Sequence, residues 1–338
     1  MKKQLQLLFL FCSLISLQLK AQNKVTYPTE LTVAQDGSGN YQTIQEAVNS
    51  VRDLSQKQVV IHIRKGTYHE KLVIPSWKTR ISLVGEDAQN TIIANADFSG
   101  KLYPGVKDAF GKDKFSTYTS YTVLVQGNDF TAENLTIQNT SGRVGQAVAL
   151  HIEGDRCIIK NCRLLGNQDT LYAATERSRQ FYQGCYIEGT TDFIFGEATA
   201  VFDKCIVKSL SNSYVSAAAT SPRQLFGFVF LRCKFIADTS AKRVYLGRPW
   251  RPYAKTVVIH CELGNHILAA GWDPWKGDSM FPDKELTTYY AEYGNTGAGA
   301  NTTGRVAWAK QLSSKEAKGY TINNILAGAD NWNPADKP

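Results

Sequence analysis

The chain has 338 residues, with 38 basic and 30 acidic side chains and a formal net charge of +8. This moderate positive charge suits an acidic partner but does not separate an acidic polysaccharide from a nucleic acid. No basic stretch interleaved with aromatic residues is present, and beyond the N-terminus no apolar run approaches the roughly 20 residues of a membrane span. We therefore expect no nucleic-acid site and no membrane anchor.

The N-terminus has the pattern of a secretory signal peptide. Two lysines follow Met1, an apolar run covers residues 5–19, and the small Ala21 comes shortly after it. We expect cleavage after Ala21, which makes residues 1–21 the signal peptide and residues 22–338 a secreted protein, periplasmic or extracellular. Cleavage removes three lysines and no acidic residue, which lowers the net charge from +8 to +5. No Pro/Ser-rich linker divides what remains, so we expect one domain.

Six cysteines remain after this cleavage, and their spacing indicates a repeat. From Cys185 onward they recur at intervals of roughly 20 to 28 residues, a period typical of a solenoid in which each repeat forms one coil. Each of them lies in a short β-prone segment. We expect these side chains to stack in rows inside the coils, with Asn in place of Cys in other coils, as in the segment 132–139. The six are Cys157, Cys162, Cys185, Cys205, Cys233 and Cys261.

An even number of cysteines in an exported chain permits disulfides. Cys185 and Cys205 would lie on successive coils, about 4.8 Å apart, which is within the range that a disulfide tolerates. The same geometry suits two reduced thiols stacked in the interior. The sequence leaves both alternatives open.

Short strand-like runs separated by Gly, Asn and Asp fill the chain, and no long helical pattern lies between them. This pattern disfavours a βαβ fold and favours an all-β solenoid, with a β-sandwich as the alternative. One early helix is predicted by the capping box at Thr43 and Glu46, because Ile44, Val48 and Val51 then share one face. We expect this helix to cover the open N-terminal end of the solenoid.

Five local sequences contain residue types suited to chemistry, and two of their intervals match the coil length. The interval from Gln146 to Gln168 and the interval from Asp169 to Asp192 each equal about one coil. On coils of about 22 residues these side chains would lie on neighbouring strands, about 4.8 Å apart. Two adjacent carboxylates repel unless one is protonated or a cation lies between them. The sequences are Gly66-Thr67-Tyr68-His69-Glu70, Gln146-Ala147-Val148-Ala149-Leu150, Gln168-Asp169-Thr170-Leu171, Asp192-Phe193-Ile194-Phe195-Gly196 and Leu246-Gly247-Arg248-Pro249-Trp250.

In this order the motifs resemble the signatures of the pectin methylesterase family, from about Val33 to about Val306. The segments 168–172 and 189–196 are the specific parts, and 66–70 is a looser marker. The resemblance implies a right-handed parallel β-helix over residues 22–338, with no metal and no other cofactor. It also implies hydrolysis of the methyl ester on C6 of galacturonate units in pectin. We expect a monomer whose partner is this methylesterified polysaccharide.

The acidic residues and Arg248 then receive roles that suit their chemistry. Ionised Asp192 attacks the ester carbonyl as the nucleophile and forms an acyl-enzyme. Asp169 starts protonated, donates to the departing methanol and later accepts a proton from water. Its pKa must therefore lie above the usual value, which burial and a neighbouring carboxylate would achieve. Arg248 holds Asp192 charged and oriented.

The remaining site residues are amides and aromatic side chains. Gln168 and Gln146 are predicted to donate hydrogen bonds to the oxyanion of the tetrahedral intermediate, with an interior polar ladder as the alternative for Gln146. Trp250 is predicted to stack on a sugar ring. Three further substrate-binding candidates are Tyr172, Phe195 and Thr117. Two tryptophans, Trp272 and Trp275, either form a wall of the site or pack beneath its loop.

Three other functions fit parts of the pattern. A retaining glycosidase also uses two carboxyls about 5 Å apart, but paired amides suit an oxyanion better than a positively charged oxocarbenium ion. A pectate lyase would need an acidic cluster for calcium, which the sequence lacks. A non-catalytic polysaccharide-binding solenoid would use the aromatic residues without needing Asp169, Asp192 and Arg248 together.

Overall fold

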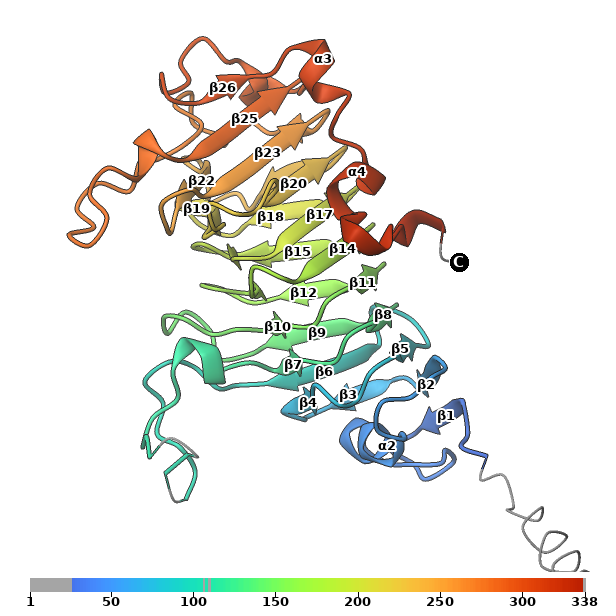
Figure 1. Ribbon diagram of the computed structural model, residues 1–338. Coiled ribbons are helices and arrows are strands. Elements are labelled where there is room, and N and C mark those ends of the chain that lie inside the picture. The colour runs from blue at the N-terminus through green and yellow to red at the C-terminus, as the bar shows by residue number, and fades with distance from the viewer. Residues whose placement is uncertain (1–25, 106, 109–110, 337–338) are drawn as a thin grey trace, which may run out of the picture.

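The computed structural model describes residues 26–105, 107–108 and 111–336, so the predicted signal peptide lies outside the described residues. Its strands form three parallel sheets that are stacked along one axis (Figure 1). Successive strands visit the three sheets in turn, and each strand pairs with its counterparts one coil away. The predicted right-handed parallel β-helix is confirmed, and the β-sandwich alternative is excluded.

The three sheets are named A, B and C. Sheet A contains β1 (Glu30–Val33), β2 (Val59–Ile63), β5 (Ile81–Gly85), β8 (Thr131–Glu133), β11 (Cys157–Lys160), β14 (Arg179–Gln183), β17 (Thr199–Asp203), β20 (Phe228–Leu231), β23 (Lys255–Ile259), β25 (Tyr289–Tyr293) and β26 (Lys310–Gln311). Sheet B contains β3 (Gly66–Tyr68), β6 (Thr91–Asn95), β9 (Thr136–Asn139), β12 (Arg163–Leu165), β15 (Tyr186–Gly189), β18 (Ile206–Ser209), β21 (Lys234–Ala237) and β24 (Glu262–Leu263). Sheet C contains β4 (Leu72–Ile74), β7 (Val123–Val125), β10 (Leu150–Ile152), β13 (Leu171–Ala173), β16 (Ile194–Gly196), β19 (Tyr214–Ala218) and β22 (Tyr245–Pro249).

The helices are short and lie outside the coils. They are α2 (Ile44–Ser50), α3 (Ser314–Ala317), α4 (Ile322–Leu326) and the 3₁₀ turns η1 (Thr117–Thr119), η2 (Lys284–Leu286), η3 (Ala298–Ala300), η4 (Gly328–Asp330) and η5 (Pro334–Asp336).

The bend from sheet A to sheet B uses the same two residues in successive coils. The first has a left-handed backbone, with φ between 51° and 62°, and the second is buried in the core. In the segment 132–139, Asn134 makes this bend and Leu135, not an Asn, takes the position that Cys occupies in the later coils. Asn tolerates a left-handed backbone because its short side chain bonds locally. The pairs are Asn134-Leu135, Asn161-Cys162, Gly184-Cys185, Lys204-Cys205, Arg232-Cys233 and His260-Cys261.

The six cysteines in the described part of the chain are buried, free thiols. From Cys185 onward, each stacked sulfur points at a backbone carbonyl of the preceding coil. The Sγ of Cys185 lies 3.3 Å from Ile159 O, and that of Cys205 lies 3.5 Å from Tyr182 O. Of the two alternatives for Cys185 and Cys205, the structure has the interior thiol ladder.

Helix α2 caps the N-terminal coil, as predicted. The capping box forms, since Thr43 Oγ1 accepts from Glu46 N and Glu46 Oε2 accepts from Thr43 N. Both oxygens of Glu70 accept from the next two helical N–H groups, at 2.9 Å each. The side-chain amide of Gln45 exchanges two hydrogen bonds with the backbone of Val73, at 2.8 and 3.0 Å. These two bonds pair the N–H and C=O groups of Val73 in β4, at the edge of sheet C, which would otherwise have no partner. The 66–70 motif is therefore structural at Glu70.

The C-terminal segment runs back along the outer face of sheet A (Figure 1). Ile325, Leu326 and Trp332 pack with apolar side chains of sheet A, including Phe181 and Val201. Burial of this second apolar cluster removes a hydrophobic stripe from solvent and joins the C-terminus to the coils.

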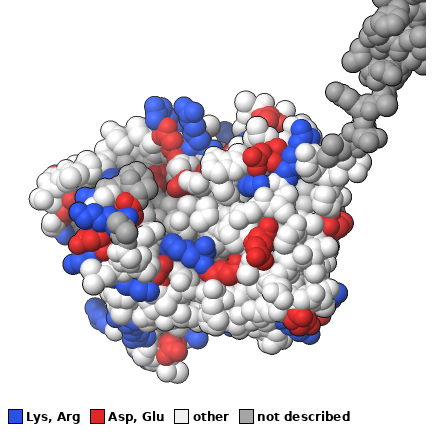
Figure 2. Space-filling view, turned by 90° about the horizontal axis from the view of Figure 1, so that it is seen from below, with Lys and Arg blue, Asp and Glu red and all other residues white. Residues whose placement is uncertain are grey.

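Charges are mixed on the face seen from the N-terminal end, where Lys and Arg side chains alternate with Asp and Glu (Figure 2). The net positive charge is therefore not gathered into one patch on that face. Within the described ranges, every helix falls short of the length and apolar character needed to cross a membrane.

The thiol ladder makes a direct prediction. Protein that is denatured without reduction should take up one alkyl group on each of the six cysteines, because none is oxidised. Peptide mass spectrometry of the alkylated protein, with a reduced sample as control, measures this uptake. A linked peptide joining Cys185 to Cys205 would contradict the ladder.

Candidate active site

A cavity of about 270 Å³ lies on the outer face of sheet C. Strand ends of successive coils form its base, and two long excursions form its sides. The first excursion, residues 96–122, precedes β7, and the second, residues 264–288, precedes β25; both project from the same side of the helix (Figure 1). The lining residues are Thr117, Tyr118, Gln146, Gln168, Asp169, Asp192, Phe195, Ala217, Arg248, Trp250 and Trp275.

Asp169 and Asp192 occupy equivalent positions on adjacent coils, as the interval between them in the sequence predicted. Each lies two residues before a strand of sheet C, and these strands pair with Leu171 opposite Ile194. Asp169 N donates to the carbonyl of Thr191 at 3.1 Å, which fixes the register. Both aspartates have a left-handed backbone, with φ of 66° and 48°, and both are buried, at 8% and 6% exposed. Two carboxyls are thus held about one strand spacing apart, with little access to water.

Arg248 binds one carboxyl of the pair through both oxygens of Asp192. Its Nε lies 3.0 Å from Oδ1, and its Nη2 lies 2.7 Å from Oδ2. The guanidinium lies between two aromatic rings, 3.9 Å from the centroid of Tyr214 and 3.6 Å from that of Trp275. Stacking on both faces and a bidentate contact at the edge leave the group little freedom.

The two carboxyls therefore differ in their electrostatic environment. Burial raises the pKa of Asp169 well above its usual value, and the charge of Asp192 raises it further, against a smaller lowering by Arg248. Burial also raises the pKa of Asp192, but the hydrogen bonds and charge of Arg248 offset part of this rise, so the pKa of Asp192 is raised less than that of Asp169. Asp192 consequently ionises first, and Asp169 keeps its proton beside that negative charge.

The amides of Gln146 and Gln168 lie on neighbouring coils at the same cavity, where the two residues form a parallel bridge. Gln146 is exposed, so the alternative of an interior polar ladder does not apply to it. Within the part of the chain that the structure describes, neither side-chain amide forms a hydrogen bond. Both N–H₂ groups are available as donors to a bound group.

The aromatic candidates form one wall. Phe195 stacks on Tyr172, with ring centroids 4.5 Å apart and planes at 6°, and Trp250 meets Phe195 edge-on at 5.7 Å. Phe195 and Trp250 line the cavity, as does Thr117 on the opposite excursion. Tyr172 packs against the rings of Phe195 and Tyr118 and thereby supports the wall. It was predicted to contact the substrate, but it is not among the residues that line the cavity.

The sequence analysis missed two lining residues, Tyr118 and Ala217, and the supporting residue Tyr214, and it left the role of Trp275 undecided. Tyr118 carries no motif signal beyond its neighbour Thr117. Tyr214 became identifiable only through its contact with Arg248. Of the two tryptophans, Trp275 forms the wall, whereas Trp272 is fully buried and donates to Glu292 Oε1 at 3.2 Å. Among the described residues, no group of three or more His, Cys, Asp or Glu side chains is arranged to hold a metal ion.

Comparison with known proteins gives consistent matches. A sequence model of the Pectinesterase family matches residues 30–329. A probable pectinesterase/pectinesterase inhibitor from Arabidopsis thaliana is 35% identical over 325 residues, which cover 92% of this chain and 50% of that protein. The chain spans about half the length of the curated relatives that it matches.

Solved structures agree with these matches. The pectin methylesterase from carrot has a TM-score of 0.79 and 36% identity, covering 91% of this chain and 96% of its own. A pectin methylesterase variant in complex with a hexasaccharide has a TM-score of 0.78 and 30% identity, covering 92% and 99%.

Replacing Arg248 by Met should lower the free energy of unfolding at neutral pH by about 3–5 kcal/mol, since a buried carboxylate loses its partner. The loss should shrink as the pH falls, because Asp192 in the variant, with its pKa raised further, then takes up a proton. Urea unfolding at two pH values measures this. Adding Asp192→Asn to the variant should restore most of the stability at neutral pH; no restoration would contradict the ion pair as the cause.

Proposed function

The chain belongs to the pectinesterase family, and from this premise we propose that it hydrolyses the C6 methyl esters of galacturonate units in pectin, with release of methanol. The observation that carries this proposal is the pair of adjacent buried carboxyls, of which Arg248 binds one. A nucleophile and an acid of the same residue type need environments that separate their pKa values, and this site has that asymmetry.

The first half of the reaction forms an acyl-enzyme. A carboxylate oxygen of Asp192 attacks the ester carbonyl, and the C=O electron pair moves to oxygen as an oxyanion. The N–H₂ groups of Gln146 and Gln168 donate to this oxyanion, each worth about 2.7–4 kcal/mol at the transition state. The tetrahedral intermediate collapses with loss of methoxide, which takes the proton of Asp169 and leaves as methanol.

The second half regenerates the enzyme. Asp169, now ionised, accepts a proton from water as that water attacks the acyl carbon. Collapse breaks the bond to Asp192, releases the galacturonate carboxyl and returns Asp192 to its ion pair with Arg248. Asp169 ends protonated, so protons and charges balance over the cycle.

The aromatic wall of the cavity supports a sugar polymer as the substrate, and the N-terminal sequence supports export of the protein. Trp250 and Phe195 offer flat apolar surface to the sugar rings of the substrate, and Thr117 lines the same cavity. The signal-like N-terminus supports export, where pectin is accessible, and we propose that the mature enzyme works there as a monomer.

Asp192→Asn should reduce methanol release from highly methylated pectin by about four orders of magnitude or more, since an amide does not attack the ester. Asp169→Asn should also be severe, because the leaving group loses its proton donor. The control is Asp238→Asn, which changes a carboxyl that is 45% exposed. Near wild-type release by folded Asp192→Asn would refute the mechanism.

Chelation should leave methanol release unchanged. The positive charge of Arg248, which binds both oxygens of Asp192, disfavours a metal cation at this carboxylate, and the described residues contain no cluster of three or more potential metal ligands. The measurement is methanol release in EDTA, with uronate chain length followed in parallel. Loss of activity that calcium restores, together with shortening of the chains, would instead favour a lyase.

A further inference from the structure

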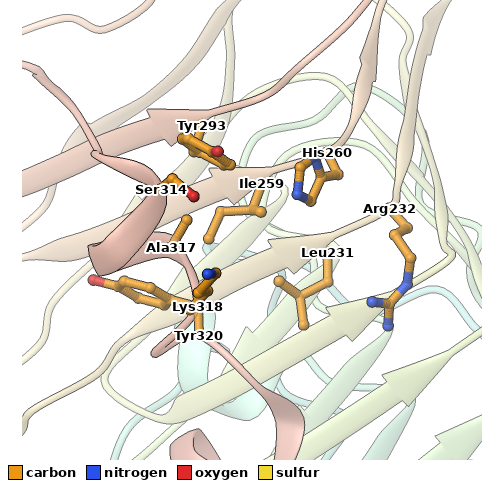
Figure 3. A pocket seen from close by; sticks show the side chains of 9 residues that line it. All are labelled: Leu231, Arg232, Ile259, His260, Tyr293, Ser314, Ala317, Lys318 and Tyr320. Atoms are coloured by element: carbon orange, nitrogen blue, oxygen red, sulfur yellow. The ribbon is translucent and has the colours of Figure 1, made fainter.

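A second cavity, of about 240 Å³, lies on the outer face of sheet A beneath α3 and shares no lining residue with the active-site cavity. Leu231 and Ile259, paired in register on β20 and β23, form its floor. Tyr293 and Tyr320 border it on two sides (Figure 3). An apolar floor with flanking aromatic rings suits the C–H face of a pyranose.

The ionisable groups at this cavity are basic, apart from the two tyrosines. Arg232, His260 and Lys318 line it, and no Asp or Glu is among its lining residues in the described chain (Figure 3). Arg232 and His260 occupy the left-handed bend of successive coils, where Arg232 N donates to Ile259 O at 3.0 Å. The bend therefore directs both side chains outward from adjacent coils, about 4.8 Å apart.

A buried carboxylate at the end of β17, the strand next to β20, positions Arg232. Asp203 is 3% exposed and accepts a hydrogen bond from Nη2 of Arg232. A guanidinium has five N–H donors, so this contact orients the group and leaves donors for a second anion. Lys318 borders the cavity from the segment after α3, and Leu231 lies between it and the guanidinium of Arg232 (Figure 3).

We propose that this cavity is a second carbohydrate site, which binds a free galacturonate unit of de-esterified pectin. The carboxylate pairs with Arg232 and Lys318, and the sugar ring lies on Leu231 and Ile259 between the two tyrosines. The identity of the sugar rests on the proposed function, because that reaction generates free uronates on the polymer. Such a site would hold the enzyme on chains that it has already de-esterified.

The experiment is native affinity electrophoresis of the mature protein in gels with and without de-esterified polygalacturonate. Lys318→Glu should weaken retardation by at least about tenfold in apparent affinity, since a charge-assisted contact becomes a repulsion. Lys315→Glu is the matched control: it changes the charge equally, on α3 itself, at a residue that does not line the cavity. Lys318→Glu should leave methanol release from a short methylated oligogalacturonate unchanged.

The effect of Lys318→Glu should persist when Trp250→Ala weakens the active-site cavity. Equal retardation of the Lys318→Glu and Lys315→Glu proteins would overturn the proposal. An equal loss of retardation by Lys318→Glu on a sulfated polysaccharide would overturn the assignment to uronate. Retardation measures binding and needs no turnover. A failure of this second site is therefore distinguishable from a failure of the proposed function, which would appear as absence of methanol release by the wild-type enzyme.

Discussion

The bidentate ion pair between Arg248 and Asp192 is the interaction on which the active site depends. Without it, two carboxyls that the coil register places side by side would both be driven toward the protonated form by burial. With it, negative charge is stabilised on Asp192, and that charge in turn keeps the proton on Asp169. One arginine thus assigns different protonation states to two residues of the same type.

The β-helix makes this arrangement rigid because each participant is fixed by backbone pairing of its own coil. Asp169 and Asp192 precede neighbouring strands, and Arg248 lies on β22, two coils beyond Asp192. The left-handed backbone at both aspartates is an uncommon conformation, and the hydrogen-bonded coils on either side hold it in place. The stacking of Tyr214 and Trp275 on Arg248 adds the last constraint.

Most of the fold and the centre of the site could be predicted from sequence because a solenoid converts sequence intervals into distances. Intervals of one coil length placed the two amides beside each other and the two carboxyls beside each other, and a capping box located α2. Sequence intervals do not predict how the long excursions outside the coils fold back, so the contact of Trp275, in the excursion 264–288, with Arg248 was not predicted. The sequence also did not distinguish the turn residue Asn134 from the buried residue beside it, because the two differ in φ and not in spacing.

Catalysis by this pair requires Asp192 to be ionised while Asp169 is protonated, and ¹³C NMR titration of labelled aspartate carboxyls measures both states. The two resonances are assigned by their absence in Asp192→Asn and Asp169→Asn. We expect Asp192 to titrate at the lower pH and Asp169 to remain protonated after Asp192 has ionised. Titration of Asp169 below Asp192 would contradict this order.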